Sequence, residues 1–195
     1  MGVRITGGRL VRRTLAVPKT GVRPTADRAR EALFSSMSAT LGHVLVDARV
    51  LDAFAGSGAL GIEALSRGAR HATFIERSAD VARVLRENLA ALDVVASTKV
   101  VVDDARRAAP RLEPASFELV FVDPPYADAV DAPFLAALDR AIAPGGVLVV
   151  ERARGETRPL EIAMPMVFDR RYGEAWVRVF AKPSTTSEPD EITTA

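Results

Sequence analysis

The sequence contains no cysteine. This absence excludes disulfide bonds, thiolate zinc sites, iron–sulfur clusters and any catalytic thiol. Histidine is nearly as scarce, because His43 and His71 are the only two and lie too far apart in sequence for a ligand pair. We therefore expect no metal site.

Long apolar runs are also missing. No uncharged apolar stretch approaches the roughly 18 residues that a membrane helix needs. The N-terminal segment has Arg4, Arg9, Arg12 and Arg13 where a secretory signal would have its apolar region. We therefore expect a cytoplasmic protein with no membrane partner.

The composition is that of a folded domain. The chain has 195 residues, of which 48% are hydrophobic and 26% charged. A chain of this length can bury a sizeable core without disulfide bonds or metal ions to stabilise it. Residues 184–195 are polar, and we expect them to form a disordered tail. The remainder is predicted to comprise a basic extension (residues 1–42) and a main domain (residues 43–183).

The charge is unevenly distributed along the chain. Residues 1–30 carry a net charge of +7, whereas the whole chain carries +1, so the remaining residues carry −6. A basic arm on an acidic body suggests that the arm contacts a polyanion. The chain has only three lysines against 23 arginines, which also fits phosphate binding, although an Arg-rich genome would have the same effect.

Hydrophobic patterning from residue 50 onward predicts a doubly wound α/β sheet. The expected strands span residues 50–54, 71–76, 99–102, 118–122 and 147–150, and two of them, 99–102 and 118–122, have the apolar character of strands buried on both faces. Helices are expected over 59–67, after a Ser78 cap, and from about Asp131 to a stop before Pro144. Alternating residues in 166–171 and 175–181 predict a final antiparallel hairpin.

The residues before this core predict two smaller elements. Residues 4–17 can form a hairpin that turns at Gly7-Gly8, and residues 25–41 can form a helix. The inward face of that helix would carry Ala29, Leu33, Phe34 and Met37.

A glycine-rich motif follows the first strand of the main domain. Gly56, Gly58 and Gly61 form the spacing G-x-G-x-x-G between a strand and a helix, which indicates a turn that cradles a cofactor. Glu76 lies 20 residues after Gly56, at the end of the next strand, where its carboxylate can accept both hydroxyls of a ribose.

The glycine motif and Glu76 fit either NAD or S-adenosylmethionine as the cofactor. Asp52 favours one of these two cofactors over the other. Asp52 ends the first strand beside the glycine turn. Its charge would oppose the pyrophosphate of NAD but favour the sulfonium and ammonium groups of S-adenosylmethionine. Asp103 and Asp104, after the third strand, add acids that can accept a hydrogen bond from an adenine amine.

A second motif, Asp123-Pro124-Pro125-Tyr126, follows the fourth strand at the edge where open α/β sheets bind ligands. The Asp123 carboxylate and the Pro124 carbonyl can accept the N–H bonds of a planar amine, and tandem prolines hold these acceptors rigidly. Tyr126 offers a face on which a flipped base can stack.

These motifs resemble those of a known family. Residues 52–67 (DAFAGSGALGIEALSR) together with DPPY are similar to the class I S-adenosylmethionine-dependent methyltransferases that act on amino groups. Arg23-Pro24-Thr25, Asp27-Arg28 and Arg30-Glu31, after Gly7-Gly8-Arg9, resemble the bacterial RsmD-type enzymes, which methylate N2 of a guanine in small-subunit (16S) ribosomal RNA. The resemblance spans roughly residues 4–182.

The resemblance implies a Rossmann-like fold with a mostly parallel seven-stranded sheet, a monomer, and ribosomal RNA within a partly or fully assembled small subunit as substrate. The predicted cofactor-binding residues are Asp52, Gly56, Ser57, Gly58, Glu76, Asp103, Asp104 and Ala105. The predicted catalytic residues are Asp123, Pro124, Pro125 and Tyr126. The predicted RNA-binding residues are Arg4, Arg9, Arg12, Arg13, Arg23 and Arg28.

The expected reaction is a direct in-line methyl transfer, with Asp123 able to accept the proton that the methylated amine loses. Without cysteine, the covalent route to pyrimidine C5 is excluded. Three alternatives remain: a DNA adenine or cytosine N-methyltransferase, a protein-glutamine methyltransferase, which would more often have Asn at position 123, and a non-enzymatic RNA-binding module.

Overall fold

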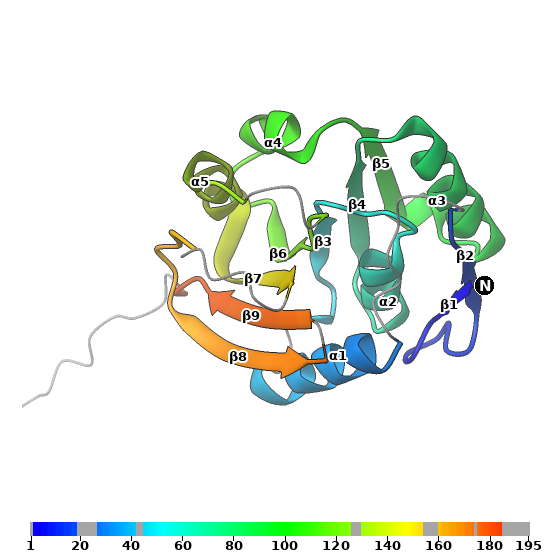
Figure 1. Cartoon of the computed structure of the whole chain (residues 1–195), viewed down its shortest axis with the longest axis horizontal. Helices are drawn as coiled ribbons and strands as arrows, with labels where there is room; N and C mark the ends of the chain where they lie inside the picture. Colours follow the sequence, from blue (N-terminus) through cyan, green and yellow to red (C-terminus); the bar gives the residue numbers. More distant parts are fainter. Residues whose placement is uncertain are drawn as a thin grey trace, which may run out of the picture.

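The computed structural model describes residues 2–18, 27–41, 45–125, 130–153, 160–173 and 175–184, with the side chains of residues 30–37 alone in the first helix. A seven-stranded sheet runs through the molecule (Figure 1). Its strands are β3 (Arg49–Asp52), β4 (His71–Glu76), β5 (Thr98–Val102), β6 (Phe117–Val122), β7 (Ile142–Ala153), β8 (Met166–Tyr172) and β9 (Ala175–Ala181).

The strand order is β5-β4-β3-β6-β7-β9-β8. The five strands from β5 to β7 are parallel, and β9 pairs antiparallel with both β7 and β8. The turn between β8 and β9 includes Gly173 at φ 61°, where an added Cβ would have no atom within 4 Å. The predicted fold class, a mostly parallel sheet ending in an antiparallel hairpin, is confirmed.

Helices cover both faces of the sheet. They are α1 (Asp27–Leu41), α2 (Ala59–Ser66), α3 (Ala79–Ala91), α4 (Ala105–Ala108) and α5 (Ala132–Ala141), with 3-10 turns at Val95–Ser97 and Ala109–Arg111. One hydrophobic cluster joins the sheet to α1, α2 and α3, and a second joins it to α4 and α5. Figure 1 shows α4 and α5 at the top of the view and α1 at the bottom. Within the described part of the chain, no helix reaches the length and apolarity required to cross a membrane.

Two helices start at the caps that the sequence predicts. The Ser78 hydroxyl accepts a hydrogen bond from the Val81 amide (3.4 Å), and α3 buries Leu85 and Leu89. The Asp131 carboxylate accepts one from the Phe134 amide (3.0 Å) at the start of α5, with proline in the first turn.

Two predictions about strands are wrong. β5 is half-exposed rather than buried on both faces, because it lies at the edge of the sheet, and Val102 is 42% exposed. β7 begins at Ile142 rather than at Val147, so Pro144-Gly145-Gly146 lies inside the strand. Gly145 takes φ 74° there, and the extra residues of β7 form an irregularity, because Phe117 pairs with Ile142 and Leu119 with Val147. The predicted end of the helix before Pro144 is confirmed, because α5 ends at Ala141.

The N-terminal hairpin pairs only β1 (Gly2–Arg4) with β2 (Thr14–Ala16). Ile5 continues this pairing through backbone hydrogen bonds with Arg12 and Arg13 (both 2.9 Å), and the residues at the tip of the hairpin lie on the end of α2. The Arg9 amide donates to the Ser66 carbonyl (2.8 Å) and the Leu10 amide to the Ser66 hydroxyl (2.9 Å). Gly8 has no room for a side chain, because a Cβ would lie 1.9 Å from the Ser66 carbonyl oxygen. The hairpin is therefore docked on the main domain.

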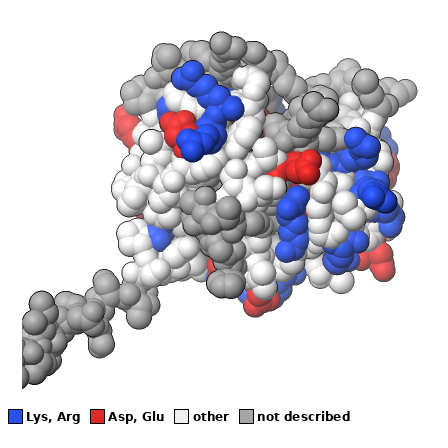
Figure 2. Space-filling view, turned by 90° about the horizontal axis from the view of Figure 1, so that it is seen from below, with Lys and Arg blue, Asp and Glu red and all other residues white. Residues whose placement is uncertain are grey.

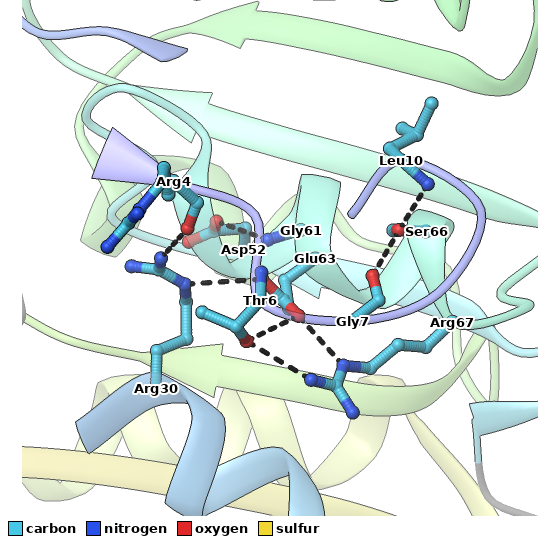
Figure 3. A network of polar contacts seen from close by, with 10 residues as sticks. All are labelled: Arg4, Thr6, Gly7, Leu10, Arg30, Asp52, Gly61, Glu63, Ser66 and Arg67. Atoms are coloured by element: carbon cyan, nitrogen blue, oxygen red, sulfur yellow. Dashed lines mark hydrogen bonds and ion pairs between the residues drawn. The ribbon is translucent and has the colours of Figure 1, made fainter. Parts of the chain in front are cut away.

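A buried carboxylate connects the hairpin to two helices (Figure 3). Glu63 on α2 has no solvent exposure, and its two oxygens accept hydrogen bonds from the amide and hydroxyl of Thr6 at 2.9 and 2.8 Å. Arg67 binds the same carboxylate at 2.8 Å and Arg30, which is 1% exposed, binds it at 3.4 Å. The Arg30 guanidinium also donates to the carbonyl of Arg4. Residues from the hairpin, α1 and α2 thus share one charged network.

Replacing Glu63 with Gln should lower the free energy of unfolding by about 3 kcal/mol or more, because it leaves the Arg30 guanidinium buried without its carboxylate. Chemical denaturation measures this change. The matched control is Glu87→Gln, which removes an exposed carboxylate from an Arg83–Glu87 pair and should cost less than about 1 kcal/mol. Equal effects of the two substitutions would contradict the role assigned to the network.

Candidate active site

Three carboxylates meet at the carboxyl edge of the sheet. Asp52 ends β3, Glu76 ends β4, and Asp123 directly follows β6. β3 lies between β4 and β6, and Asp52 pairs with Phe74 on one side and Phe121 on the other. The parallel register therefore brings together acids that are far apart in the sequence.

The glycine turn between β3 and α2 has the conformation that its motif predicts. Gly56 and Gly58 have φ values of 53° and 86°, in the left-handed region that disfavours side chains. A Cβ on Gly58 would also lie 2.4 Å from Leu85 Cδ1. Ser57 is buried, and its carbonyl accepts a hydrogen bond from the Asn88 side chain at 3.1 Å. The turn is thus held close to α3.

Glu76 connects this turn to the start of α3. Its Oε2 accepts a hydrogen bond from the Gly56 amide (3.0 Å), and its Oε1 accepts one from the Ser78 amide (2.8 Å). The side chain is half-buried, and each carboxylate oxygen has a further lone pair. Glu76 can therefore orient the turn and still accept hydrogen bonds from a ligand.

Asp52 lies deeper than the other two acids. Its Oδ2 accepts a hydrogen bond from the Gly61 amide at 3.0 Å, and its residue is only 2% exposed. Burial is the main cause that raises the pKa of Asp52 to about 7; the charges of Asp123 and Glu76 act in the same direction, and the Gly61 hydrogen bond opposes them. A cation bound among these three groups would favour the ionised form of Asp52.

The carboxylates of this site fit an organic cation that carries hydroxyl groups. Three carboxylates and a glycine turn offer negative charge and hydrogen-bond acceptors, which match the sulfonium, ammonium and ribose of S-adenosylmethionine better than a pyrophosphate. In the residues that the structure describes, no group of three or more acids and histidines is arranged to hold a metal ion.

The acids after β5 lie at the same edge of the sheet but have partners of their own. Asp103 pairs with Arg107 (3.1 Å) and with Arg111, and the Arg111 hydrogen bond is the main cause that holds the pKa of Asp103 below its usual range. Asp104 caps α4 by accepting a hydrogen bond from the Arg106 amide (2.9 Å), and Ala105 is buried. The adenine contact predicted for this segment stays a prediction.

The amine-binding motif is only partly described. Asp123 and Pro124 are half-buried and Pro125 is exposed, all on the loop that follows β6. Tyr126 lies outside the described residues. The motif begins beside the glycine turn, because Asp52 pairs with Phe121 and the Ala53 amide donates to the Phe121 carbonyl (3.0 Å), two residues before Asp123.

The predicted RNA-binding arginines lie on the docked hairpin and the helix that follows. Arg4, Arg9 and Arg12 are exposed, and Arg12 has a φ of 69°. Arg13 is exposed but donates a hydrogen bond to the Ala91 carbonyl at the end of α3 (2.7 Å). Arg23 lies outside the described residues. Arg28 lies on α1, and its side chain is outside the described part of that helix.

Sequence reasoning missed the side chains that support this site. Asn88 donates to the carbonyls of Ala16 and Ser57 and accepts from the Ala16 amide, so it joins the hairpin to the glycine turn. Its position on the inward face of α3 was the available signal. Glu63 and Arg30 are linked across 33 positions, and no local pattern indicates that pair.

A groove lies at the opposite edge of the sheet, near the starts of the parallel strands. Its lining includes Arg49, Arg70, His71, Ser97 and Phe117. Arg49 is paired there with Glu118 (2.5 Å) and Arg70 with Asp47 (3.7 Å). None of the predicted site residues lines this groove, so we place the chemistry at the carboxyl edge.

Comparisons with known proteins find a matching family and several similar proteins. The family described as "Conserved hypothetical protein 95" matches residues 3–181. The protein YlbH of Bacillus subtilis is 34% identical over 184 residues, which are 91% of this chain and 97% of that protein. Ribosomal RNA small subunit methyltransferase D of Escherichia coli is 46% identical over 125 residues, 64% of this chain and 60% of that protein. The solved structure of yhhF from Escherichia coli superposes with a TM-score of 0.81 and 35% identity, over 94% of this chain and 99% of that one.

Replacing Asp52 with Asn should change how stability depends on pH. In the folded wild type the pKa of Asp52 is about 7 instead of the usual 3.8, so the folded state holds its proton more tightly than the unfolded state. This contribution is complete below pH 4 and is lost as the pH rises to about 7. The Asn variant cannot ionise, so its melting temperature should rise relative to wild type between pH 4 and 7. A difference that does not vary with pH would overturn this assignment.

Proposed function

Given that this chain belongs to the family described as Conserved hypothetical protein 95, we propose that it transfers a methyl group from S-adenosylmethionine to the N2 amine of a guanine in small-subunit (16S) ribosomal RNA. The observation that carries this proposal is the strand pairing by which β3, β4 and β6 end side by side, with Asp52, Glu76 and the Asp123-Pro124 loop at their carboxyl ends. The name of the Escherichia coli relative supports the choice of substrate. The cytoplasm is the proposed location, since that substrate is ribosomal.

The residues of the glycine turn would hold the cofactor. S-adenosylmethionine, when bound, supplies an electrophilic methyl group on a positively charged sulfur. Glu76 would accept hydrogen bonds from ribose hydroxyls through its remaining lone pairs, and Asp52 would stabilise the positive charge. Asp103 or Asp104 would accept from the adenine amine. Ser57, Gly58 and Ala105 contribute close backbone packing around the site.

The loop after β6 would hold the guanine amine. The Asp123 carboxylate and Pro124 carbonyl accept the two N–H bonds, which turns the nitrogen lone pair out of conjugation with the base. Proline donates no backbone N–H, so the tandem prolines neither compete for these acceptors nor allow the loop much freedom. A methylated amine is strongly acidic, and its proton passes to an Asp123 oxygen and from there to water. Orientation of the two substrates supplies most of the rate enhancement.

The hairpin arginines would contact RNA phosphates. Arg4, Arg9 and Arg12 are exposed on an element that the Glu63 network fixes to α2. A fixed basic element can bind a structured RNA without first becoming ordered. The proposed partner is ribosomal RNA in a partly or fully assembled small subunit.

Replacing Asp123 with Ala should reduce methyl transfer by about 100-fold or more, because the amine loses an aligned acceptor. Incorporation of labelled methyl groups into small-subunit RNA from a strain lacking the enzyme measures this rate, and nucleoside analysis of the wild-type product should give N2-methylguanosine. Calorimetry should show that the variant still binds S-adenosylhomocysteine and that neither protein binds NAD.

The control for that substitution is Asp80→Ala, which removes an exposed carboxylate from the first turn of α3 and should leave transfer unchanged. Wild-type activity of the Asp123 variant would exclude the amine-binding role. A product of N6-methyladenine would favour the DNA-type alternative instead.

Replacing Arg9, Arg12 and Arg13 together with Gln should weaken RNA binding at low salt. Each lost phosphate contact should flatten the slope of log affinity against log salt by roughly 0.7 to 0.9, because fewer counterions are released. Filter binding across a salt series gives this slope. A variant with Gln at Arg70, Arg83 and Arg86 loses the same charge from other exposed positions and should keep the wild-type slope. Identical slopes for all three proteins would remove the assigned role of the hairpin.

A further inference from the structure

The C-terminal hairpin carries a row of basic and aromatic side chains that the proposed site does not use. Across three neighbouring strands, Arg152 on β7 pairs with Trp176 on β9, which pairs with Arg171 on β8. Arg178 lies two residues further along β9, on the same face as Trp176. We refer to Arg171, Trp176 and Arg178, with Asp169, as the hairpin stack.

The groups of the hairpin stack are held in contact with one another. The Arg178 guanidinium lies 3.6 Å from the centre of the Trp176 ring, and that of Arg171 lies 4.9 Å from it. The indole N–H donates to an Asp169 oxygen at 2.5 Å, and the other Asp169 oxygen pairs with Arg178 at 3.4 Å. These contacts fix the planes of the guanidinium groups, while Arg171 remains exposed. The stack retains a positive charge even with Asp169 included.

The hairpin stack lies at the same edge of the sheet as the proposed site. Val122, directly before Asp123, pairs with Val150, and Val150 pairs with Arg178. Trp176 lies two residues past that level, toward the carboxyl edge of the parallel strands. Two strand spacings separate β9 from β6, so the stack begins about 10 Å across the sheet from the Asp123 loop.

We propose that the hairpin stack is a second RNA contact, which binds an unpaired nucleotide next to the target guanine. This inference rests on the proposed function. A nucleobase can stack on the exposed face of the Arg171 guanidinium, and the N–H groups at its rim can donate to a phosphate. A guanine drawn from RNA into the Asp123 loop leaves neighbouring nucleotides unstacked, and such bases are what a flat cationic surface binds.

The hairpin stack is separate from the N-terminal hairpin. Figure 1 shows β8 and β9 toward the left of the view and β1 and β2 at the right, and Figure 2 shows that the described Lys and Arg side chains on the face it draws lie in separate groups. An RNA that contacts more than one group must therefore extend across the molecule. The contact at the hairpin stack would orient the strand at the site, whereas the arginines of the N-terminal hairpin would supply general phosphate attraction.

The first experiment uses the intrinsic fluorescence of the wild-type protein. Trp176 is the only tryptophan in the chain, so its emission reports directly on the hairpin stack. Titration with a short single-stranded RNA oligonucleotide should quench this emission with the same affinity that filter binding gives. Binding without any change in emission would overturn the proposal, and so would an equal response to a duplex of the same sequence.

The second experiment compares neighbouring arginines on the same strand. Arg171→Gln should weaken binding of the single-stranded RNA about tenfold and raise KM for the ribosomal RNA substrate. Arg170→Gln is the matched control. Arg170 is also exposed, so this substitution removes the same charge, but the Arg170 side chain lies over Phe168 on the opposite face of the hairpin. Arg171→Lys keeps the charge but lacks the planar group, and should restore only part of the affinity.

These results distinguish binding by the hairpin stack from attraction by charge alone, and distinguish a failure of this inference from a failure of the proposed function. Equal losses in the Arg170 and Arg171 variants, or full recovery with Lys, would mean that charge alone acts, and the stack would lose its role. Thermal melting of each variant shows whether the hairpin remains folded. If the wild type methylates ribosomal RNA and Arg171→Gln behaves like wild type, only this inference fails; if the wild type methylates no RNA, the proposed function fails first.

Discussion

The carboxylate of Glu63 is the interaction on which the arrangement of this molecule depends. It is fully buried on α2 and accepts bonds from Thr6, Arg30 and Arg67. A buried carboxylate is unfavourable unless charged partners surround it, so each partner is held where the carboxylate requires it. The N-terminal hairpin and α1 thereby share one buried anchor on the main domain, in addition to their other contacts with it.

The same short helix connects this network to the proposed chemistry. At its amino end, Gly58 leads into α2 and the Gly61 amide donates to Asp52; near its other end, Glu63 and Ser66 bind the hairpin. α2 has eight residues, most of them buried, so it has little freedom to move at one end alone. The N-terminal hairpin, proposed to contact RNA, and the glycine turn, proposed to hold the cofactor, are therefore positioned by a common rigid element, and Asn88 links them again from α3.

Local patterns predicted most elements of the fold and the residues that meet at the sheet edge. Ser78 and Asp131 cap their helices as expected, and the glycine turn has the expected conformation, because such signals depend on neighbours in the sequence. β7 and β5 were mispredicted, because a proline-glycine pair can bend inside a paired strand and because edge position depends on strand order. The Glu63 network and the hairpin stack depend on contacts between distant segments, which no single-sequence pattern specifies.

The turn after β8 has a consequence for how related proteins can diverge. β9 is antiparallel, so this turn reaches the carboxyl edge of the parallel strands while belonging to none of them. Gly173 there faces open space, since an added Cβ would have no atom within 4 Å. Insertions at this point would therefore leave the core unchanged while placing new residues beside the site, which makes the turn a natural position for acquiring a different RNA preference.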